Sequence, residues 1–435
     1  MNFLGATILS VIVAVVLLGS RRLAVLALAA GILFLTQNQG VEVFKLNLYA
    51  FRILELAGIL RVILRRELSS VKLNRIDRMV ILLYSFITVV SLLRYTDESS
   101  YQIAAAVDAT LAYFIFRALI LTIEDFKYVL NRYVLLLVPF FGAVLIERLT
   151  FQNPFALVGA NLYIADFREG VPRCTGSFRH AILMGSFGAV FLPIYIGLAL
   201  CEDRKFWPTV GCVICLGIVG LSNSGGPLSS VVIGIIGWSL WIFRRKMRTV
   251  RYFLALILFV LALLMKAPLW ALPAKISDLT GGGGWHRYYL IEMAIKSLSD
   301  WWIAGMPIEQ TKDWFPYIIH TGGADITNEF ISLGLSAGIL AIVIFVILLV
   351  KAFKLIGEVL EAIRNTKTDN SHEFLVWGVG VSLLVHISNW FGVSYFDQIK
   401  FVWHLHIAIV AMLAEAAELL KAPNHVLHSF EKSEA

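Results

Sequence analysis

Long apolar runs recur along the whole chain and constrain its fold more than any other feature. A helix that crosses a bilayer needs about 20 mostly apolar residues, and 59% of this 435-residue chain is hydrophobic. A soluble domain of this size cannot bury so much apolar surface, and the runs lack the alternation of a membrane β-barrel. The sequence therefore predicts an all-α polytopic membrane protein.

About 12–13 transmembrane helices are expected, in a single membrane domain over residues 1–435. The count stays open because the first two segments are short and the third is charged. The first carries no basic residues ahead of it and no small-residue cleavage site, so we expect a retained helix. The expected segments are 3–19, 23–37, 43–63, 78–94, 101–121, 130–147, 181–201, 206–222, 228–243, 250–265, 329–351, 373–391 and 398–420.

Lys and Arg gather in one set of alternate loops, with clusters at 21–22, 65–78 and 244–251. Basic loops of this kind face the cytoplasm. The formal net charge of +7 is thereby explained by topology and lipid contact, and we expect no nucleic-acid partner. The two long loops, 148–180 and 266–328, are then extracytoplasmic.

The larger of these loops is expected to carry an amphipathic helix on the membrane surface. Apolar residues repeat there with helical spacing, and tryptophans supply interfacial anchors. The apolar positions are Leu290, Met293, Ala294, Ile295 and Leu298, and the anchors are Trp285, Trp301, Trp302 and Trp314. Four glycines at 281–284 precede Arg287 and indicate a hinge beside a cation.

Polar clusters mark the ends of several segments. Arg173, Arg179 and His180 lie at the entry to an apolar helix, where uncompensated charge is costly and often marks an anionic ligand. The stretch 221–230, LSNSGGPLSS, suits either an anion-binding concavity or, as we favour, a plain turn. A third cluster opens the segment at 329. Its members are His320, Asp325, Thr327, Asn328 and Glu329, of which Asp325 and Thr327 are also explained as N-caps.

Other polar residues favour packing over chemistry. Cys212 and Cys215 lie in an apolar run without His or carboxylate neighbours, which indicates helix packing. A His-rich stretch near the C-terminus fits no closed zinc pattern, so we expect hydrogen bonds between helices and no metal site. Its polar members are His386, Asn389, Asp397, His404 and His406.

Three segments together resemble the O-antigen ligase and O-antigen polymerase superfamily, a group of multi-spanning glycosyltransferases. RCTGSFRHAILMGSFGAVFLPI is similar to the family's Arg-x-x-Gly-x-Phe-x-His-Pro-Asn segment. GGGWHRYYLIEMAIKSLSDWWIAGMP is similar to its Gly-Arg…Trp…His-Pro-Leu-x-Gly segment, and DITNEFISLGLSAGILAIVIFVILL to its His-Asn-x-Phe-Leu segment. The likeness covers residues 170 to 350 by motif. The remainder matches only in helix number and topology.

The resemblance implies a metal-independent glycosyltransferase without a cofactor. Its donor would be a glycan linked to undecaprenyl diphosphate, and its other partners a glycan acceptor, membrane lipid and a chain-length regulator protein. The diphosphate would be held by Arg173 or Arg179 and by Arg287, since a guanidinium binds phosphate oxygens through two hydrogen bonds. Substrate contacts would come from His180, His286 and Asn328.

One departure from the family concerns the general base. Thr327 stands where the family has a histidine, and a hydroxyl cannot serve as a base near neutral pH; Ala181–Ile182 likewise replaces the family's Pro-Asn. His320, Asp325 and Glu329 are therefore the candidate catalytic residues.

The leading expectation is a polymerase of lipid-linked repeat units in O-antigen or exopolysaccharide synthesis. It would be a multi-pass protein of the bacterial inner membrane. The first alternative is an O-antigen ligase that joins finished glycan to lipid A core. The second is a transporter of lipid-linked sugars, which the lack of an internal repeat disfavours.

Overall fold

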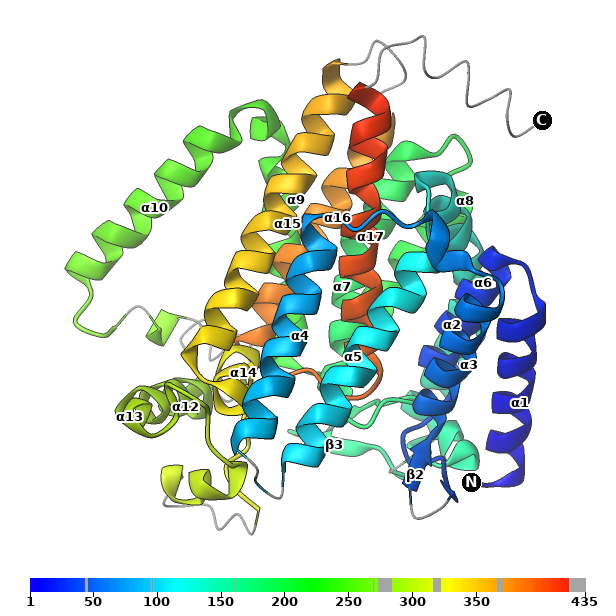
Figure 1. Cartoon of the computed structure of the whole chain (residues 1–435), viewed down its shortest axis with the longest axis horizontal. Helices are drawn as coiled ribbons and strands as arrows, with labels where there is room; N and C mark the ends of the chain where they lie inside the picture. Colours follow the sequence, from blue (N-terminus) through cyan, green and yellow to red (C-terminus); the bar gives the residue numbers. More distant parts are fainter. Residues whose placement is uncertain are drawn as a thin grey trace.

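The computed structural model describes a bundle of long helices with short loops at one end and larger loops at the other (Figure 1). The described residues are 1–43, 46–94, 96, 98–160, 162–268, 270–272, 284–315, 322–365 and 371–421. The long helices are α1 (Phe3–Leu18), α2 (Arg21–Phe34), α3 (Ala50–Leu64), α4 (Arg75–Arg94), α5 (Ser99–Leu119), α6 (Ile123–Thr150), α7 (Ala181–Cys201), α8 (Phe206–Leu221), α9 (Gly225–Ser239), α10 (Met247–Leu264), α15 (Ile339–Asn365), α16 (Ser371–Trp390) and α17 (Gln398–Lys421).

Every predicted membrane segment coincides with at least one of these helices. Six helical runs in the described part of the chain are long and apolar enough to cross a membrane, among them α7 and α15. Two more apolar helices, α1 and α8, are shorter. The chain is therefore an all-α, multi-pass membrane protein, as the apolar runs predict.

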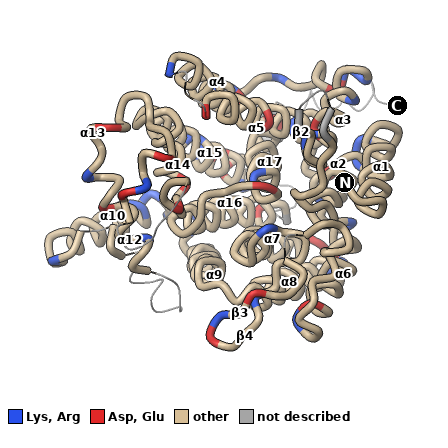
Figure 2. The backbone as a smooth tube through the Cα atoms, turned by 90° about the horizontal axis from the view of Figure 1, so that it is seen from below, with Lys and Arg blue, Asp and Glu red and all other residues tan. Residues whose placement is uncertain are grey.

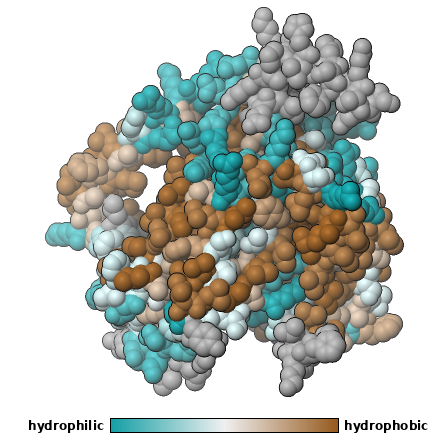
Figure 3. Space-filling model, in the orientation of Figure 1, coloured by the Kyte–Doolittle hydropathy of each residue, from teal (hydrophilic) through white to brown (hydrophobic). Residues whose placement is uncertain are grey.

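The surface and the interior divide as a membrane protein requires. A wide hydrophobic band crosses the face of the bundle seen in Figure 3, with hydrophilic residues gathered toward its two ends. Seen from the loop end, α16 lies at the centre, among α7, α9, α15 and α17 (Figure 2). We call the end near Arg22, Arg65 and Arg244 the basic end, and the end formed by the loops after α6 and α10 the loop end.

Two predicted spans are shorter than expected because the backbone breaks them. The segment 43–63 becomes helical only at Ala50, since β2 (Leu46–Tyr49) precedes it and pairs antiparallel with β1 (Gly40–Val43). The segment 329–351 divides into α14 (Glu329–Ala337) and α15 at Gly338. Gly338 has a φ of 82°, and a Cβ there would lie 2.3 Å from the carbonyl oxygen of Ile303. Only glycine fits that position.

The loop after α10 folds onto the protein. It contains α12 (Gly284–Lys296), the short α13 (Leu298–Trp301) and a 3-10 helix at Ile308–Trp314. The predicted helix is thus present, but its buried positions Leu290 and Ala294 join a small core that includes α14. That core also takes Trp301 and Trp314, which are 5% and 4% exposed. Their expected role as membrane anchors is therefore wrong, whereas Trp285 and Trp302 are half-exposed.

The loop between α6 and α7 begins three residues later than predicted, because α6 continues to Thr150. It holds a short 3-10 helix, Pro154–Val158, and a hairpin of β3 (Asp166–Arg168) and β4 (Val171–Arg173). Two hydrogen bonds from Asn153 fix the segment after β4, one to the Thr175 hydroxyl and one to the Gly176 carbonyl. The loop is thus an ordered platform that leads into α7.

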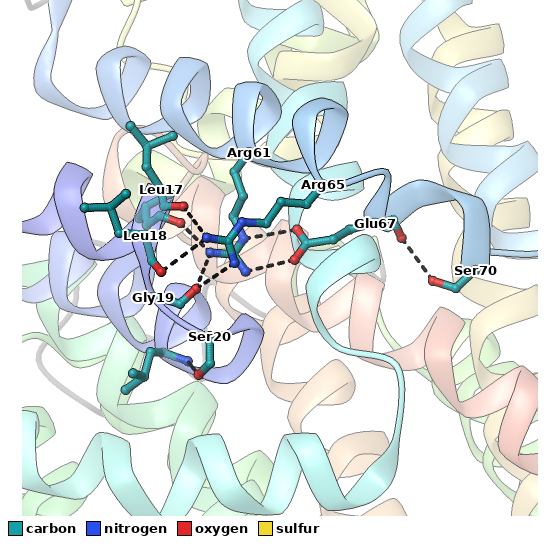
Figure 4. Close-up of polar contacts among 10 residues, drawn as sticks. Leu17, Leu18, Gly19, Ser20, Arg61, Arg65, Glu67 and Ser70 are labelled. Atoms are coloured by element: carbon teal, nitrogen blue, oxygen red, sulfur yellow. Dashed lines mark hydrogen bonds and ion pairs between the residues drawn. The ribbon is translucent and has the colours of Figure 1, made fainter. Parts of the chain in front are cut away.

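Arg61 of α3 and Arg65, which caps that helix, fasten the N-terminal helices at the basic end (Figure 4). The carbonyls in the last turn of a helix lack intrahelical donors, and arginines supply them at the end of α1. Arg61 donates to the carbonyls of Val16 and Gly19 at 2.7 and 2.8 Å. Its other side forms a two-point ion pair with Glu67. Arg65 donates to the carbonyls that follow Val16. The charge in the third predicted span is therefore structural at this end.

Candidate functional site

Two of the three predicted arginines, Arg173 and Arg287, meet at the turn that starts α9. Arg173 comes from β4 and pairs with Asp166 at 3.1 Å, while its other nitrogen donates to Ser224 Oγ at 3.1 Å. Arg287 comes from α12. A Cβ built on Gly226 would lie 3.4 Å from Arg287 Nη2, so the guanidinium rests against that glycine. Two arginines from different loops therefore reach positions two residues apart.

The α9 turn is itself favourable for an anion. The first backbone N–H groups of a helix have no intrahelical acceptor and carry the positive end of the helix dipole. Here those groups belong to Gly225, which is buried, and to Gly226, which is half-buried and has no side chain to cover the helix end. The stretch 221–230 is thus a turn, as favoured, which also presents a helix N-terminus to both arginines.

Arg179 reaches the same region from another side. Its Nε lies 2.7 Å from Asp397 Oδ2, in the loop 391–397 that joins α16 and α17. Arg287 contacts that loop as well, because a Cβ on Gly392 would lie 3.1 Å from Arg287 Cζ. Seen from the loop end, α12 lies beside α9 and α16, which agrees with these contacts (Figure 2). Arg287 thus contacts both the α9 turn, to which Arg173 binds, and the loop 391–397, to which Arg179 binds.

The loop 391–397 also holds the start of α14. Glu329 Oε2 accepts a hydrogen bond from the Tyr395 backbone N–H at 2.6 Å. Ser394 Oγ donates to the carbonyl of Ile326 at 2.7 Å. The segments that carry the arginines and the carboxylate Glu329 are therefore joined through one loop, although they lie far apart in the sequence.

The cluster that precedes α14 divides into structural and accessible groups. Asn328 is buried and is the N-cap of α14, since its side-chain oxygen accepts from the N–H groups of Phe330 and Ile331. Capping by Asp325 or Thr327 is therefore wrong. Asp325 is exposed, and Glu329 is half-buried. His320, the third catalytic candidate, and the glycines 281–283 lie outside the described residues.

The two predicted substrate histidines differ in their surroundings. His286 stacks on Phe315, with ring centroids 4.4 Å apart, and its Nε2 is 3.2 Å from the Asp325 carbonyl oxygen. His180 is exposed at the start of α7, with its ring 6.1 Å from that of Phe396. His286 therefore helps to join α12 to the segment before α14, whereas His180 is accessible beside Arg179.

Two adjoining cavities lie behind this loop, with volumes of about 470 and 420 Å³. The first is lined by Arg179 and Asp397, and the second by Asp325 and Glu329. Lys400 lines both cavities, so the two adjoin at that residue. Arg179 and Glu329 thus line neighbouring cavities that meet at one lysine.

Several polar residues of these cavities are absent from the sequence-based candidates. Arg52 pairs with Asp108 at 3.0 Å across α3 and α5, and Glu55 lies beside them. Lys400, which lines both cavities, lies within the His-rich stretch. Charge inside predicted membrane segments was the signal that could have identified all four, because such charge is rarely without function.

The His-rich stretch forms interhelical hydrogen bonds, as predicted. Ser382 Oγ of α16 lies 3.1 Å from His406 Nδ1 of α17, and Tyr84 of α4 is 2.7 Å from His404 Nε2. Ser230 of α9 donates to Asn389 at 2.8 Å. Among the described residues no group of three His, Cys, Asp or Glu side chains is arranged to hold a metal ion. These contacts hold α16 and α17 behind the loop.

Burial and charge act in opposite directions on Asp397. Burial raises the pKa of its carboxyl group above the usual range, while Arg179 and Lys400 stabilise the ionised form. Burial likewise raises the pKa of Glu98, in the turn before α5, although that carboxylate accepts the backbone N–H of Ile308. The loop end therefore holds half-buried carboxyl groups that are each paired: Asp397 with the Arg179 guanidinium and Glu98 with the Ile308 N–H.

A buried carboxylate positions the segment between Arg173 and Arg179. Glu147, in the last turn of α6, accepts the backbone N–H groups of Thr175 and Gly176 at 2.8 and 2.9 Å. Replacing it by an apolar residue would leave both donors buried without partners, at about 1–3 kcal/mol each. The carboxylate therefore holds both arginines in place.

We expect Glu147→Leu to loosen this segment. Trypsin should cleave after Arg173 or Arg179 about tenfold faster or more, because cleavage follows the population of the opened segment. Glu147→Gln keeps one acceptor and should be cleaved at an intermediate rate. Cleavage after Lys296, in the other loop, is the internal control. Equal rates in all three proteins would contradict the positioning role.

No protein-family model matches this sequence, and no curated protein matches it. The functional assignment therefore depends on the chemistry of the site and on the resemblance of the three motifs.

Proposed function

We propose that this protein polymerises undecaprenyl-diphosphate-linked oligosaccharide repeat units on the extracytoplasmic side of the bacterial inner membrane. We place the basic end in the cytoplasm and the loop end outside, with thirteen membrane crossings. An acceptor hydroxyl would attack the anomeric carbon of the donor glycan. The bond from that carbon to the diphosphate oxygen breaks, and undecaprenyl diphosphate leaves.

The observation that carries this proposal is the meeting of three arginines around the α9 turn and the loop 391–397. A diphosphate leaving group gains negative charge as the bond breaks, and fixed cations stabilise that charge most where water is scarce. Arg287 contacts both segments, with Arg173 at one and Arg179 at the other. The helix N-terminus at Gly225 adds N–H donors to the same region.

We assign the general base to Glu329. A base must lie close to the acceptor hydroxyl and must be held in a fixed orientation. Glu329 is oriented by the Tyr395 N–H, lines the 420 Å³ cavity and shares that cavity with Lys400. Asp325 lines the same cavity, but it is exposed. The acceptor proton would pass to Glu329 while the other carboxylate oxygen keeps its hydrogen bond.

Replacing Glu329 by Gln tests this assignment, because the amide oxygen can still accept from Tyr395 but cannot take a proton. We expect glycan transfer by the purified protein in liposomes to fall by about 10²–10⁴-fold, with normal expression and melting. Asp313→Asn removes an exposed carboxylate from the same loop region and should leave transfer unchanged. A fully active Glu329→Gln variant, or a loss confined to Asp325→Asn, would contradict the choice of base.

A gel of the glycans in cells that lack the protein separates the polymerase from the ligase. Loss of a polymerase leaves single repeat units on the carrier or on lipid A core. Loss of a ligase leaves long polymer on undecaprenyl diphosphate. Our proposal expects single units, and accumulated long polymer would favour the ligase.

A further inference from the structure

A second basic cavity lies at the opposite end of the molecule, far from the arginines of the loop end. Its volume is about 720 Å³, and it lies between α15 and the segment that joins α9 to α10, the 3-10 helix Leu240–Lys246. Six of its lining residues are cationic and two are acidic. The cationic residues are Arg244, Arg245, Arg248, Arg251, Lys354 and Arg364, and the acidic ones are Glu358 and Glu361.

One side of this cavity is rigidly built. Glu373 of α16 is buried and pairs with both Arg244 and Arg364. The Arg244 guanidinium lies over the Trp241 ring at 4.4 Å, and that ring stacks on Phe374. The indole and the carboxylate therefore fix these two arginines as a wall.

The other cations face the cavity without this support. Arg245, Arg248, Arg251 and Lys354 are exposed, and none forms an ion pair within the part of the chain that the structure describes. Of the two acidic residues, Glu358 already pairs with Arg75 of α4. The cavity thus has an excess of positive charge that the protein's own carboxylates leave uncompensated.

Below the cavity, the exposed faces of α15 and α10 are apolar. Phe353 lines the cavity, and Val346 and Val350 continue the same face of α15 below it; all three are exposed. On α10, Leu254 and Leu258 follow the face of Arg251 and are also exposed. No residue of α10 is buried, and open space separates this helix from the bundle (Figure 3). A ligand would therefore meet cations at one end and hydrocarbon below them.

We infer that this cavity binds an anionic phospholipid, with the phosphate among the arginines and the acyl chains between α10 and α15. Basic pockets between membrane helices recognise phosphate-bearing headgroups through the same charge pairing. The lipid would fill the space that separates α10 from the bundle. This site is independent of the glycan chemistry proposed above.

Native mass spectrometry of the detergent-purified full chain tests the inference, with dioleoylphosphatidylglycerol as the probe. The wild type should bind this lipid at least about tenfold more tightly than dioleoylphosphatidylcholine. The triple variant Arg245→Gln, Arg248→Gln, Arg251→Gln should lose that preference. Its three positions are exposed, so it should fold normally. Lys354→Glu, from the opposite wall, should weaken binding in the same direction.

A matched triple variant controls for net charge. Arg66 and Lys72 are exposed in the connection between α3 and α4, and Arg78 is exposed on α4. These elements lie at the same end of the bundle but away from α10 (Figures 1 and 2). Replacing the three residues by Gln should leave the preference for phosphatidylglycerol intact. Equal losses in both triple variants would overturn the site, and so would unchanged binding in the first. Displacement of the lipid by millimolar inorganic phosphate would show that the cavity takes soluble phosphate compounds instead.

Discussion

Replacing Arg287 by Ala should reduce glycan transfer by about 10²–10³-fold, the loss expected when one preorganised group that stabilises a leaving-group charge is removed. Arg287 contacts both Gly226 and Gly392, so its guanidinium is the group common to the α9 turn and the loop 391–397. Cells that carry this variant should show single repeat units in place of polymer. The measurement is polymer length on a glycan gel.

The matched control is Lys296→Ala, on the same helix. Lys296 is exposed, and within the described ranges its ion pair is with its neighbour Glu292 along α12, at 2.8 Å. Both variants remove one cation from α12, and only the first removes it from the α9 turn. Polymer of normal length in Arg287→Ala would remove the basis of the proposed donor site. Equal losses of polymer in the two variants would show that the effect comes from the lost positive charge of α12 and not from the position of Arg287.

The largest loss of stability is expected from Asp77→Ala, at about 3–5 kcal/mol. Asp77 of α4 is fully buried and accepts hydrogen bonds from Tyr113 at 2.6 Å and from Arg117 Nε at 3.3 Å, both on α5. Arg117 also pairs with Glu415 of α17. Without the aspartate, a fully buried guanidinium loses a charged partner in the protein interior, where water cannot replace it.

Thermal melting in detergent measures this effect, followed by a dye that reacts with cysteines. Cys174, Cys201 and Cys215 are buried, so labelling reports unfolding. Glu202→Ala removes the partner of Lys127 in a half-exposed pair and should cost about 1 kcal/mol or less. Equal melting of the two variants would contradict the importance of the buried network.

The helices were predictable because each is encoded locally. A long run of apolar residues predicts a membrane helix whichever helices pack against it. The predicted segment 181–201 therefore matches α7 residue for residue. Breaks were harder to predict. The division at Gly338 depends on the close approach of Ile303, about 35 residues away in the sequence, and no local pattern contains that contact.

The candidate site was predictable only in part, for the same reason. Arg173, Arg179 and Arg287 stand out in their loops as charges at membrane boundaries. What brings them together is the loop 391–397, whose own sequence reads as a turn after a His-rich helix. Lys400 and Asp397 gain their importance from cavities formed by helices that are distant in the sequence. Trp301 and Trp314 show the opposite case. Tryptophan in a loop near the membrane predicts an interfacial anchor, but tertiary packing buries both side chains in the small core of α12 and α14.

The most direct test of the donor site is an experimental structure with undecaprenyl diphosphate bound. We predict that the two phosphates lie within hydrogen-bonding distance of Arg287 and of Arg173 or Arg179, next to the N-terminus of α9. Phosphates located elsewhere, such as in the cavity at the basic end, with Arg287 unoccupied, would contradict the account.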